Sequence, residues 1–333
     1  MTVVTHDADR NSGAVEAGIL EHLQAAQRAF AGPGGTPRRT FHVKTILAAD
    51  ARLIVRPAIP DGLRAGVFAS PREFPAIVRL SSGQSWDQPD WVPDVRGLAV
   101  RILDVPFPPV PGGPEGIQDL LAINANVRFP STPEQFAKLA PLMRSMATVP
   151  FRIWRALSPR EVWMLGSDFS RIGRLTFTCL SAQSFHGIAP MAMGTGAAKV
   201  SFRPRTPQPR RAPLFARHGL RQSLETALLD EDLAWDLCLQ PFIDEHTTPI
   251  ENLWVRWSAA HSPPVDVATL VLKRRDAAAA DRLRALVETM SFSPWNATLS
   301  HQPLGRIQAL RRAAYLASAT GRQPRDAAPQ SRG

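Results

Sequence analysis

Short strand-like segments separated by turn residues occupy much of this chain and restrict the folds open to it. Five of them lie between residues 40 and 126: TFHVKTILA, ARLIVRP, PAIVRLSS, RGLAVRIL and QDLLAINAN. They are rich in β-branched and aliphatic residues, and Pro, Gly and Asp separate them, as is typical of strands. Similar segments return as RLTFTCLSAQSF, AKVSFRP, NLWVRWS and VATLVLK. Strands grouped around helical insertions predict an α+β fold, an antiparallel β-barrel with helices outside.

Helical patterns interrupt and follow these strands. Thr132 and Gln135 form a capping box around Pro133, which favours a helix start there, and SPREVWML repeats the device. The breaks at GPGGTP and after Gly321 suggest three parts: a helical arm over 1–36, one domain over 37–322 and a disordered tail over 323–333. The helices we expect cover 15–31, 131–146, 221–240, 276–290 and 303–319.

Charge and composition exclude several classes of protein. The net charge is +10, but the basic residues are scattered in short clusters, so we expect no nucleic-acid partner. No apolar run approaches the roughly 20 residues of a membrane span, and the N-terminus does not look like a signal peptide. Two cysteines cannot form a disulfide framework or a cysteine metal cage. The sequence therefore suggests a cytoplasmic enzyme.

A single tyrosine, Tyr315, lies in the last predicted helix with Arg311 one turn before it. Residues four apart share a helix face, so the guanidinium and the phenol are neighbours. A guanidinium beside a phenol favours the phenolate, and tyrosine is one of the few axial ligands that proteins use for haem iron. The alternative is an ordinary amphipathic tyrosine beside a solvated arginine, which this pair alone does not exclude.

His42 is the candidate acid–base residue. We place it in a strand with Arg39 three residues before it, so that their side chains face opposite sides. A histidine titrates near working pH and can serve as a general base for a bound hydroperoxide. A histidine among apolar neighbours is also often a satisfied core residue.

Five motifs together resemble the haem catalase superfamily, in particular its short, catalase-related branch. They occur in the family's order: RRTFHVK, FPAIVRLSSG, DVRGLAVRILD, QDLLAINANVRFP and RRAAYLASATGR. The resemblance runs from about residue 39 to residue 322. It implies a catalase-like barrel with haem b buried between the barrel and the C-terminal helix. It also implies a peroxide substrate and a reductant that the sequence does not identify, and it allows a homo-oligomer.

The resemblance assigns roles to individual residues. Tyr315 resembles the haem iron ligand, as tyrosinate, with Arg311 as its charge partner. His42 resembles the distal base, which Ser81 orients. Asn124 is our choice for the distal amide, with Asn126 in reserve. The haem itself is expected to contact propionate-binding arginines and a stacking ring, which match Arg39, Arg79, Arg322 and Phe136. Asp94 matches the aspartate at the mouth of the substrate channel.

Several positions depart from the pattern of the large catalases. Phe41 replaces a small residue before the histidine and is expected to crowd the distal pocket. An alignment on Asp119 puts Ile123 where the family has its distal asparagine. Gly83 is expected to widen the channel, and Arg128 brings a charge to its wall.

These departures favour a peroxidase-like enzyme that cleaves the O–O bond of hydrogen peroxide or of an organic (lipid) hydroperoxide. Two alternatives remain open. One is a catalase that dismutates hydrogen peroxide, and the other is a haem-binding protein of the same fold without turnover.

Overall fold

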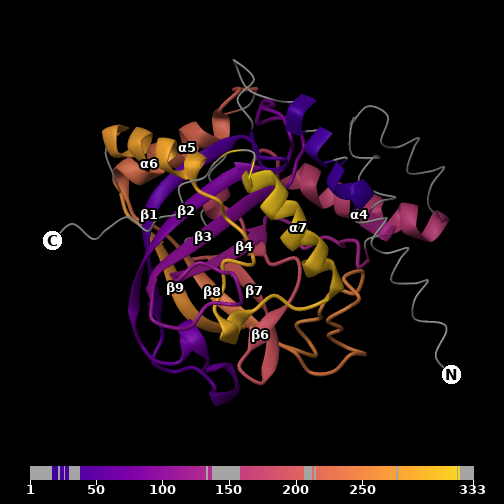
Figure 1. Ribbon diagram of the computed structural model, residues 1–333. Helices are drawn as coiled ribbons and strands as arrows, with labels where there is room; N and C mark the ends of the chain where they lie inside the picture. Colours follow the sequence, from indigo (N-terminus) through magenta and orange to yellow (C-terminus); the bar gives the residue numbers. More distant parts are fainter. Residues whose placement is uncertain are drawn as a thin grey trace.

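The computed structural model contains a closed antiparallel β-barrel (Figure 1). It describes residues 17–21, 23–25, 27–29, 38–132, 134–136, 158–205, 212–213, 215–274, 277–320 and 322. The strands are β1 (Thr45–Val55), β2 (Glu73–Ser82), β3 (Arg96–Val105), β4 (Gly116–Ile123), β5 (Phe185–His186), β6 (Met191–Met193), β7 (Gly196–Pro204), β8 (Leu233–Pro241) and β9 (Val265–Leu272).

The barrel closes through a long strand order and one short strand. Neighbouring strands follow the order β5-β4-β3-β2-β1-β9-β8-β7-β6, and β5 also pairs with β7. Strand β5 therefore joins the two ends into an eight-stranded ring, and β6 extends β7 as a hairpin. Closure leaves no free sheet edge among these eight strands. The predicted α+β barrel is confirmed.

The barrel interior is an apolar core. Alternate residues of each long strand point inward, as a period of two requires, and on β2 these are Val78 and Leu80. The residues that alternate with them along β2, Ile77, Arg79 and Ser81, point to the outer face. The interior side chains from the other strands include Leu53, Leu98, Val100, Leu120, Phe202, Trp235, Leu237 and Leu270.

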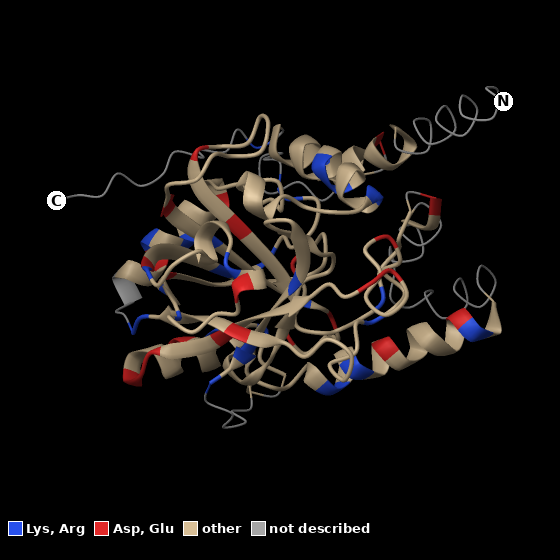
Figure 2. Ribbon diagram, turned by 90° about the horizontal axis from the view of Figure 1, so that it is seen from below, with Lys and Arg blue, Asp and Glu red and all other residues tan. Residues whose placement is uncertain are grey.

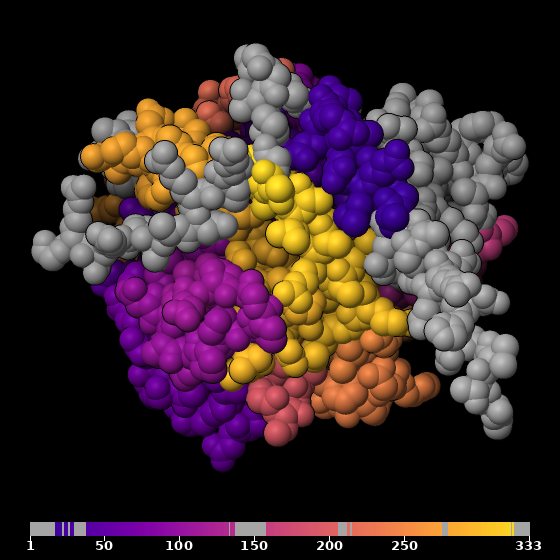
Figure 3. All heavy atoms as spheres, viewed as in Figure 1, coloured from indigo at the N-terminus to yellow at the C-terminus, as the bar shows by residue number. Residues whose placement is uncertain are grey.

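Helices cover the outer face of the barrel (Figure 1). Helix α6 (Ala277–Thr289) lies over β1 and contributes Val287 to a small apolar cluster with Ala48 and Ile77. Helix α7 (Arg306–Thr320) crosses in front of β3 and β4. In Figure 3, α7 is visible at the surface beside the indigo N-terminal segment. Helices α4 (Pro159–Leu175) and α5 (Gly219–Asp230) complete the outer layer.

Several predicted elements differ from those observed. Residues 40–44 precede β1 and are not a strand. Most of 174–185 forms the end of α4, turns and a short 3-10 helix, and only its end enters β5. The predicted helix over 221–240 ends at Asp230 and continues as β8, and the predicted strand over 252–258 is a loop. Each error lies where tertiary packing overrides a weak local preference.

Part of the predicted N-terminal arm lies within the described residues. Residues 17–21, 23–25 and 27–29 are helical, and Ile19 and Leu23 pack against Leu310 of α7. The predicted tail, Gly321 and most of the predicted helix over 131–146 lie outside the described residues. None of the helices in the described ranges has the length and apolar character that a membrane crossing requires. Acidic and basic residues are interspersed around the molecule (Figure 2).

Candidate functional site

The backbone at His42 adopts a left-handed conformation just before β1. Its φ is +56°, which a non-glycine residue adopts only at some cost. The backbone N of His42 donates to Gly83 O at 3.1 Å, and its carbonyl accepts from Arg79 Nη2 at 2.6 Å. Our placement of His42 in a strand is therefore wrong. These two contacts hold the turn that brings its ring back over the barrel wall.

The ring of His42 rests on the outer face of β2 and β3. Its Nδ1 lies 3.1 Å from Ser81 Oγ, within hydrogen-bond distance. A Cβ added at Gly97 would lie 2.7 Å from both Cε1 and Nδ1 of the ring. Only glycine leaves room for the imidazole there, because real Cβ atoms do not approach so closely. Ser81 and Gly97 are direct partners in the β2–β3 register.

Electrostatics hold His42 in its neutral form. Its pKa is lowered to about 3, first by burial and then by nearby cations, of which Arg79 has the largest effect and Arg39 and Arg311 follow. A neutral imidazole at neutral pH has a lone pair available to accept a proton. Arg311, on α7, is thus close enough to His42 to affect its pKa.

A row of three residues across β2, β3 and β4 defines the wall beside His42. Ser81 pairs with Gly97, and Gly97 pairs with Ile123. Residues directly opposite in antiparallel strands point to the same face, so Ile123 lies beside the glycine that carries the imidazole. Ile123 is buried and offers no hydrogen-bond donor from its side chain.

Asn124, our choice for the distal amide, already has two protein partners. Its Oδ1 accepts from the backbone N of Arg96 at 2.7 Å, and its Nδ2 donates to Gln183 Oε1 at 2.7 Å. The residue is 4% exposed. Its amide links the β3–β4 pair to the segment before β5. A role toward a peroxide would require one of these bonds to open.

Three arginines converge beside His42. Arg39 donates from both terminal nitrogens to Met290 O, at 3.0 and 2.9 Å, and from one of them to Val287 O. Arg322 Nη1 approaches the same Met290 carbonyl at 3.4 Å. Arg79 donates from Nε to Thr45 Oγ1 at 2.8 Å. Met290, just after α6, thus binds Arg39 and Arg322, whereas Thr45 and His42 hold Arg79.

This cluster brings three positive charges close together. The pKa of Arg39 is lowered well below its usual value by burial, then by Arg79 and Arg322. Burial lowers the pKa of Arg79 to about 10. Glu288 raises both, yet its side chain is 46% exposed and lies 4.0 Å from Arg39 Nε. Arg39 Nε is also buried without a hydrogen-bond partner among the described atoms.

Tyr315 and Arg311 are adjacent on α7, as their spacing predicts. The guanidinium carbon of Arg311 lies 5.7 Å from the centroid of the Tyr315 ring. Arg311 Nη1 donates to Gln308 Oε1 at 2.9 Å, so an amide orients the guanidinium without neutralising it. One turn nearer the C-terminus, Ser318 Oγ accepts from the backbone N of Thr40 at 3.1 Å. This contact ties the segment that carries His42 to the helix that carries Tyr315.

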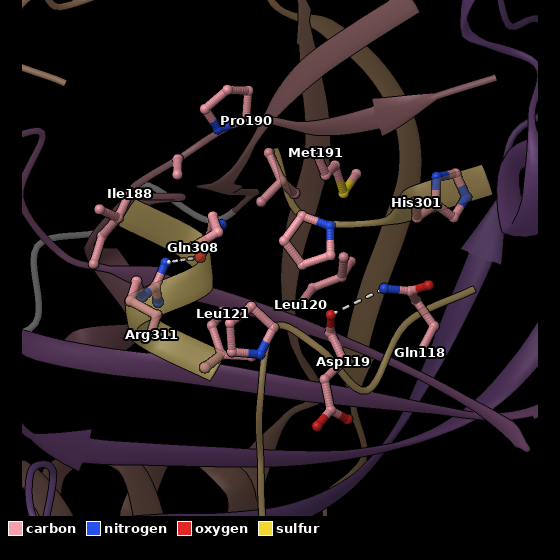
Figure 4. Close-up of a pocket in the computed structure, with 14 residues that line it drawn as sticks. Gln118, Asp119, Leu120, Leu121, Ile188, Pro190, Met191, His301, Gln308 and Arg311 are labelled. Carbon is pink, nitrogen blue, oxygen red and sulfur yellow. Dashed lines mark hydrogen bonds between the residues drawn. The ribbon is translucent and has the colours of Figure 1, made fainter. Parts of the chain in front are cut away.

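A pocket beside Arg311 is lined by residues of α7, of β4 and of the segment before β6 (Figure 4). Arg311 and Gln308 project toward it from α7, and Leu121 and His301 also line it. Neither His42 nor Tyr315 lines this pocket. It is therefore distinct from the region between His42 and α7.

Two departures expected from the sequence look different in the structure. Phe41 is 44% exposed, so much of its surface faces solvent. A Cβ at Gly83 would meet Val95 Cγ2 at 2.4 Å, so neighbouring atoms already occupy the space that we expected to widen a channel. Asp94 Oδ2 accepts from Gly83 N at 2.8 Å and thereby supports the turn that receives His42 N. Burial raises the pKa of Asp94 to about 6.

Phe136 belongs to an apolar cluster that includes α7. Its ring centroid lies 6.3 Å from that of Phe129, and both pack against a cluster that contains Leu310. Ala314, the residue before Tyr315, packs against the same cluster. Phe136 thus lies beside the helix of the candidate ligand.

Sequence reasoning missed three contributors to the site. Gly97 had a signal, because a glycine inside a strand often marks a close approach. Gln308 lies at the (i, i−3) position from Arg311, a spacing at which helical side chains interact. Glu288 had no signal, because only the folded chain brings α6 beside Arg39 and Thr45.

Comparisons with solved structures identify the fold. A bacterial catalase is 18% identical, with a TM-score of 0.66 over 87% of this chain and 58% of that chain. A fungal catalase is 17% identical, with a TM-score of 0.69 over 87% and 60%. Catalase A from Saccharomyces cerevisiae is 16% identical, with a TM-score of 0.66 over 87% and 62%.

Other comparisons add no family assignment. No protein-family model matches the chain, and a search of curated proteins found no match. The chain spans about three fifths of the length of the catalases that it resembles. The resemblance expected from the sequence motifs is confirmed at the level of architecture. This chain has the catalase fold.

Proposed function

We propose that the protein is a haem-dependent oxidoreductase that cleaves the O–O bond of a peroxide, with haem b as its cofactor and Tyr315 as the iron ligand. One observation carries the proposal. In a catalase fold, the segment that carries His42 contacts the helix that carries the chain's one tyrosine, through the hydrogen bond from Thr40 N to Ser318 Oγ, and Arg79 donates to the backbone of that histidine.

The arginine cluster fits a haem. Arg79 and Arg322 lie close enough to Arg39 to lower its pKa, and Arg39 Nε, 4.0 Å from the half-exposed Glu288, is buried without a hydrogen-bond partner among the described residues. A haem carries two propionates, and planar guanidinium groups suit carboxylates. The residues that would hold the haem therefore supply the charge that its propionates need.

The proximal residues fit the same group. A phenolate is a strong ligand for ferric iron, and Arg311, whose Nη1 donates to Gln308 Oε1, would lie beside that anion. The haem would supply the electrons that reduce the peroxide bond. Phe136 would provide an apolar contact.

His42 and Ser81 would move the proton. With Nδ1 engaged by Ser81, Nε2 of His42 is the atom that accepts a proton from one peroxide oxygen and returns it to the departing oxygen. The low pKa of the imidazole keeps it unprotonated at neutral pH, so that its lone pair is available for that proton. An external reductant would complete a peroxidase cycle.

The wall beside His42 favours an organic hydroperoxide over hydrogen peroxide. Ile123 presents a hydrocarbon where an amide could otherwise hold a small polar substrate, and the amide of Asn124 is engaged by Arg96 and Gln183. Hydrogen peroxide dismutation is the second candidate, because the solved structures named above are catalases.

The test is an absorption spectrum with a turnover assay. We expect the protein produced with ample haem to show a high-spin ferric tyrosinate spectrum that Tyr315→Phe loses. His42→Ala should keep the spectrum and lose about 100-fold or more of the hydroperoxide turnover. A protein that takes up no haem, or a His42→Ala variant with full turnover, would contradict the proposal. Faster consumption of hydrogen peroxide alone than of organic hydroperoxides would favour the second candidate.

A further inference from the structure

Lys199, on β7, is the one lysine in the described residues that has no charged partner there. The chain has only four lysines among its 39 lysine and arginine residues. Two others within the described ranges form ion pairs, Lys44 with Asp90 at 2.9 Å and Lys273 with Asp232 at 2.9 Å. Lys199 forms no ion pair and no hydrogen bond with the described residues, and it is only partly exposed. Removing a cation from water without such a partner is costly, so its charged form is disfavoured.

The ring of Trp257 lies beside the amine of Lys199. Its centroid is 5.6 Å from Nζ, within the range of a cation–π contact. Two hydrogen bonds fix this residue. Gln240, opposite Lys199 on β8, donates to Trp257 O at 3.3 Å, and Trp257 Nε1 donates to Pro249 O at 3.1 Å. The ring of Phe242 lies 6.4 Å from that of Trp257, so the amine is next to a held aromatic pair.

His186 shares the outer face of the barrel with Lys199. It pairs with Ser201 on β7, and Lys199 lies two residues before Ser201, so the side chains point to the same side. On β4, His186 pairs with Ile123, which belongs to the wall beside His42. The imidazole of His186 has no hydrogen-bond partner among the described residues, and its pKa is lowered to about 4, first by burial and then by Lys199. A neutral imidazole keeps one N–H that can donate.

These surroundings suit a lysine rather than an arginine. Burial lowers the pKa of Lys199 to about 8, so about a tenth of the amine is neutral at pH 7. The groups that face it are the neutral His186 and the uncharged Gln240 and Trp257. An arginine would stay charged there. A desolvated amine that is partly neutral at working pH is a nucleophile, and such lysines form imines with carbonyl compounds.

We propose that Lys199 is a covalent binding site for a small apolar aldehyde, which lies against Trp257 and accepts a hydrogen bond from His186. The amine attacks the carbonyl carbon, a C–N bond forms, and the electron pair of the C=O bond moves to the oxygen. That oxygen takes up one proton from the nitrogen. The resulting hydroxyl leaves as water with the second proton of the nitrogen, and the C=N bond forms. The inference goes beyond the proposed function, because this chemistry needs neither haem nor a peroxide.

The experiment traps the imine with cyanoborohydride in the full-length protein and locates the adduct by mass spectrometry. With benzaldehyde at pH 7.5, we expect the adduct at Lys199 to form about tenfold or more faster than at Lys273, because an ordinary exposed lysine offers little neutral amine at this pH. The rate at Lys199 should saturate with benzaldehyde and level off above about pH 8. Lys273 is the control in the same chain, with its side chain 49% exposed beside Asp232.

Two variants locate the site. Lys199→Arg keeps a cation beside Trp257 and should give no adduct at position 199. His186→Leu should slow the reaction at Lys199 by about tenfold, the loss of one hydrogen bond to the carbonyl oxygen. Circular dichroism checks that both variants are folded. An unchanged rate in His186→Leu would overturn the proposed part of His186.

The native protein alone can overturn the proposal. An adduct at Lys199 that forms no faster than at Lys273 would do so, and so would a rate that rises linearly with benzaldehyde, since no binding step would then precede the reaction. A larger preference for Lys199 with 4-carboxybenzaldehyde than with benzaldehyde would also overturn it, because the site would then select an anion.

Discussion

The imidazole of His42 lies against Gly97, so closely that a Cβ at position 97 would be 2.7 Å from two atoms of the ring. Ser81, the direct partner of Gly97 on β2, holds the same ring at 3.1 Å. One strand position supplies the space for the imidazole, and its partner supplies the hydrogen bond. The orientation of the proposed base therefore depends on a residue that has no side chain.

Gly97→Ala should displace the ring of His42 from Ser81. We expect at least about a tenfold loss of hydroperoxide turnover, because a displaced general base forfeits part of its 10²- to 10⁴-fold contribution. The haem spectrum should persist, since the change leaves α7 and the arginines intact. The control is Gly166→Ala on α4, where an added Cβ meets nothing within 4 Å. Full turnover in Gly97→Ala would show that the ring does not need its observed position.

The barrel strands were predictable because their local patterns agree with their tertiary role. Val78 and Leu80 alternate with outward residues, and Pro, Gly and Asp mark the turns. The segment before β1 was not predictable in this way. TFHVKTILA is uniformly strand-like, but the contacts of His42 with Gly83 and Arg79 bend its first half out of the strand. Those partners lie about 40 residues away, so no local pattern could indicate the bend.

In the candidate site, too, local features were predictable and contacts between distant segments were not. The spacing of Arg311 and Tyr315 is local to one helix, and the structure has them adjacent. Asn124 is buried between Arg96 and Gln183 through strand pairing and a loop. The spacing of residues along the sequence reveals neither of these. The group of arginines around Arg39 likewise forms only when α6 and α7 pack on the barrel.

Arg79→Leu should weaken haem retention. If Arg79 faces a buried propionate, its removal leaves that charge unpaired and costs roughly 3–5 kcal/mol of binding free energy. Haem transfer to apomyoglobin measures the loss rate directly. Arg52→Leu is the control, because Arg52 forms an exposed pair with Glu73, their side chains being 54% and 47% exposed. Equal retention in the two variants would count against the propionate role of Arg79.

His301 should make the protein less stable in acid. It is 1% exposed, its Nε2 accepts from Val67 N at 3.1 Å, its Nδ1 lies 3.3 Å from Ala192 O, and burial lowers its pKa to about 4. The unfolded chain binds the proton near pH 6.5 and the folded chain only near pH 4. The contribution of His301 to the free energy of unfolding is therefore full above pH 6.5. It is lost as the pH falls to about 4, a change of about 3 kcal/mol.

Urea unfolding of the apoprotein at pH 7.5, 6 and 5 tests this prediction. His301→Gln should be less stable at pH 7.5, because it cannot reproduce both contacts, but it should lose less stability on acidification. Some acid sensitivity should remain, since burial lowers the pKa of His42 and His186 in the same direction. If the free energy of unfolding depends on pH equally in the native protein and in His301→Gln, the protonation of His301 does not differ between the folded and unfolded states.

Ile123→Asn should move the substrate preference toward hydrogen peroxide. Ile123 shares a row with Gly97 and Ser81, so an amide there would place a donor beside His42. A donor aimed at developing charge contributes typically 10²- to 10³-fold, and we expect at least about a tenfold rise in kcat/KM for hydrogen peroxide relative to cumene hydroperoxide. The buried amide should also cost about 1–3 kcal/mol of folding free energy. Ile123→Val, which keeps an apolar wall, is the control for repacking. If kcat/KM for hydrogen peroxide relative to cumene hydroperoxide is equal in both variants, the residue at position 123 does not set the substrate preference. The apolar wall beside His42 would then have another purpose.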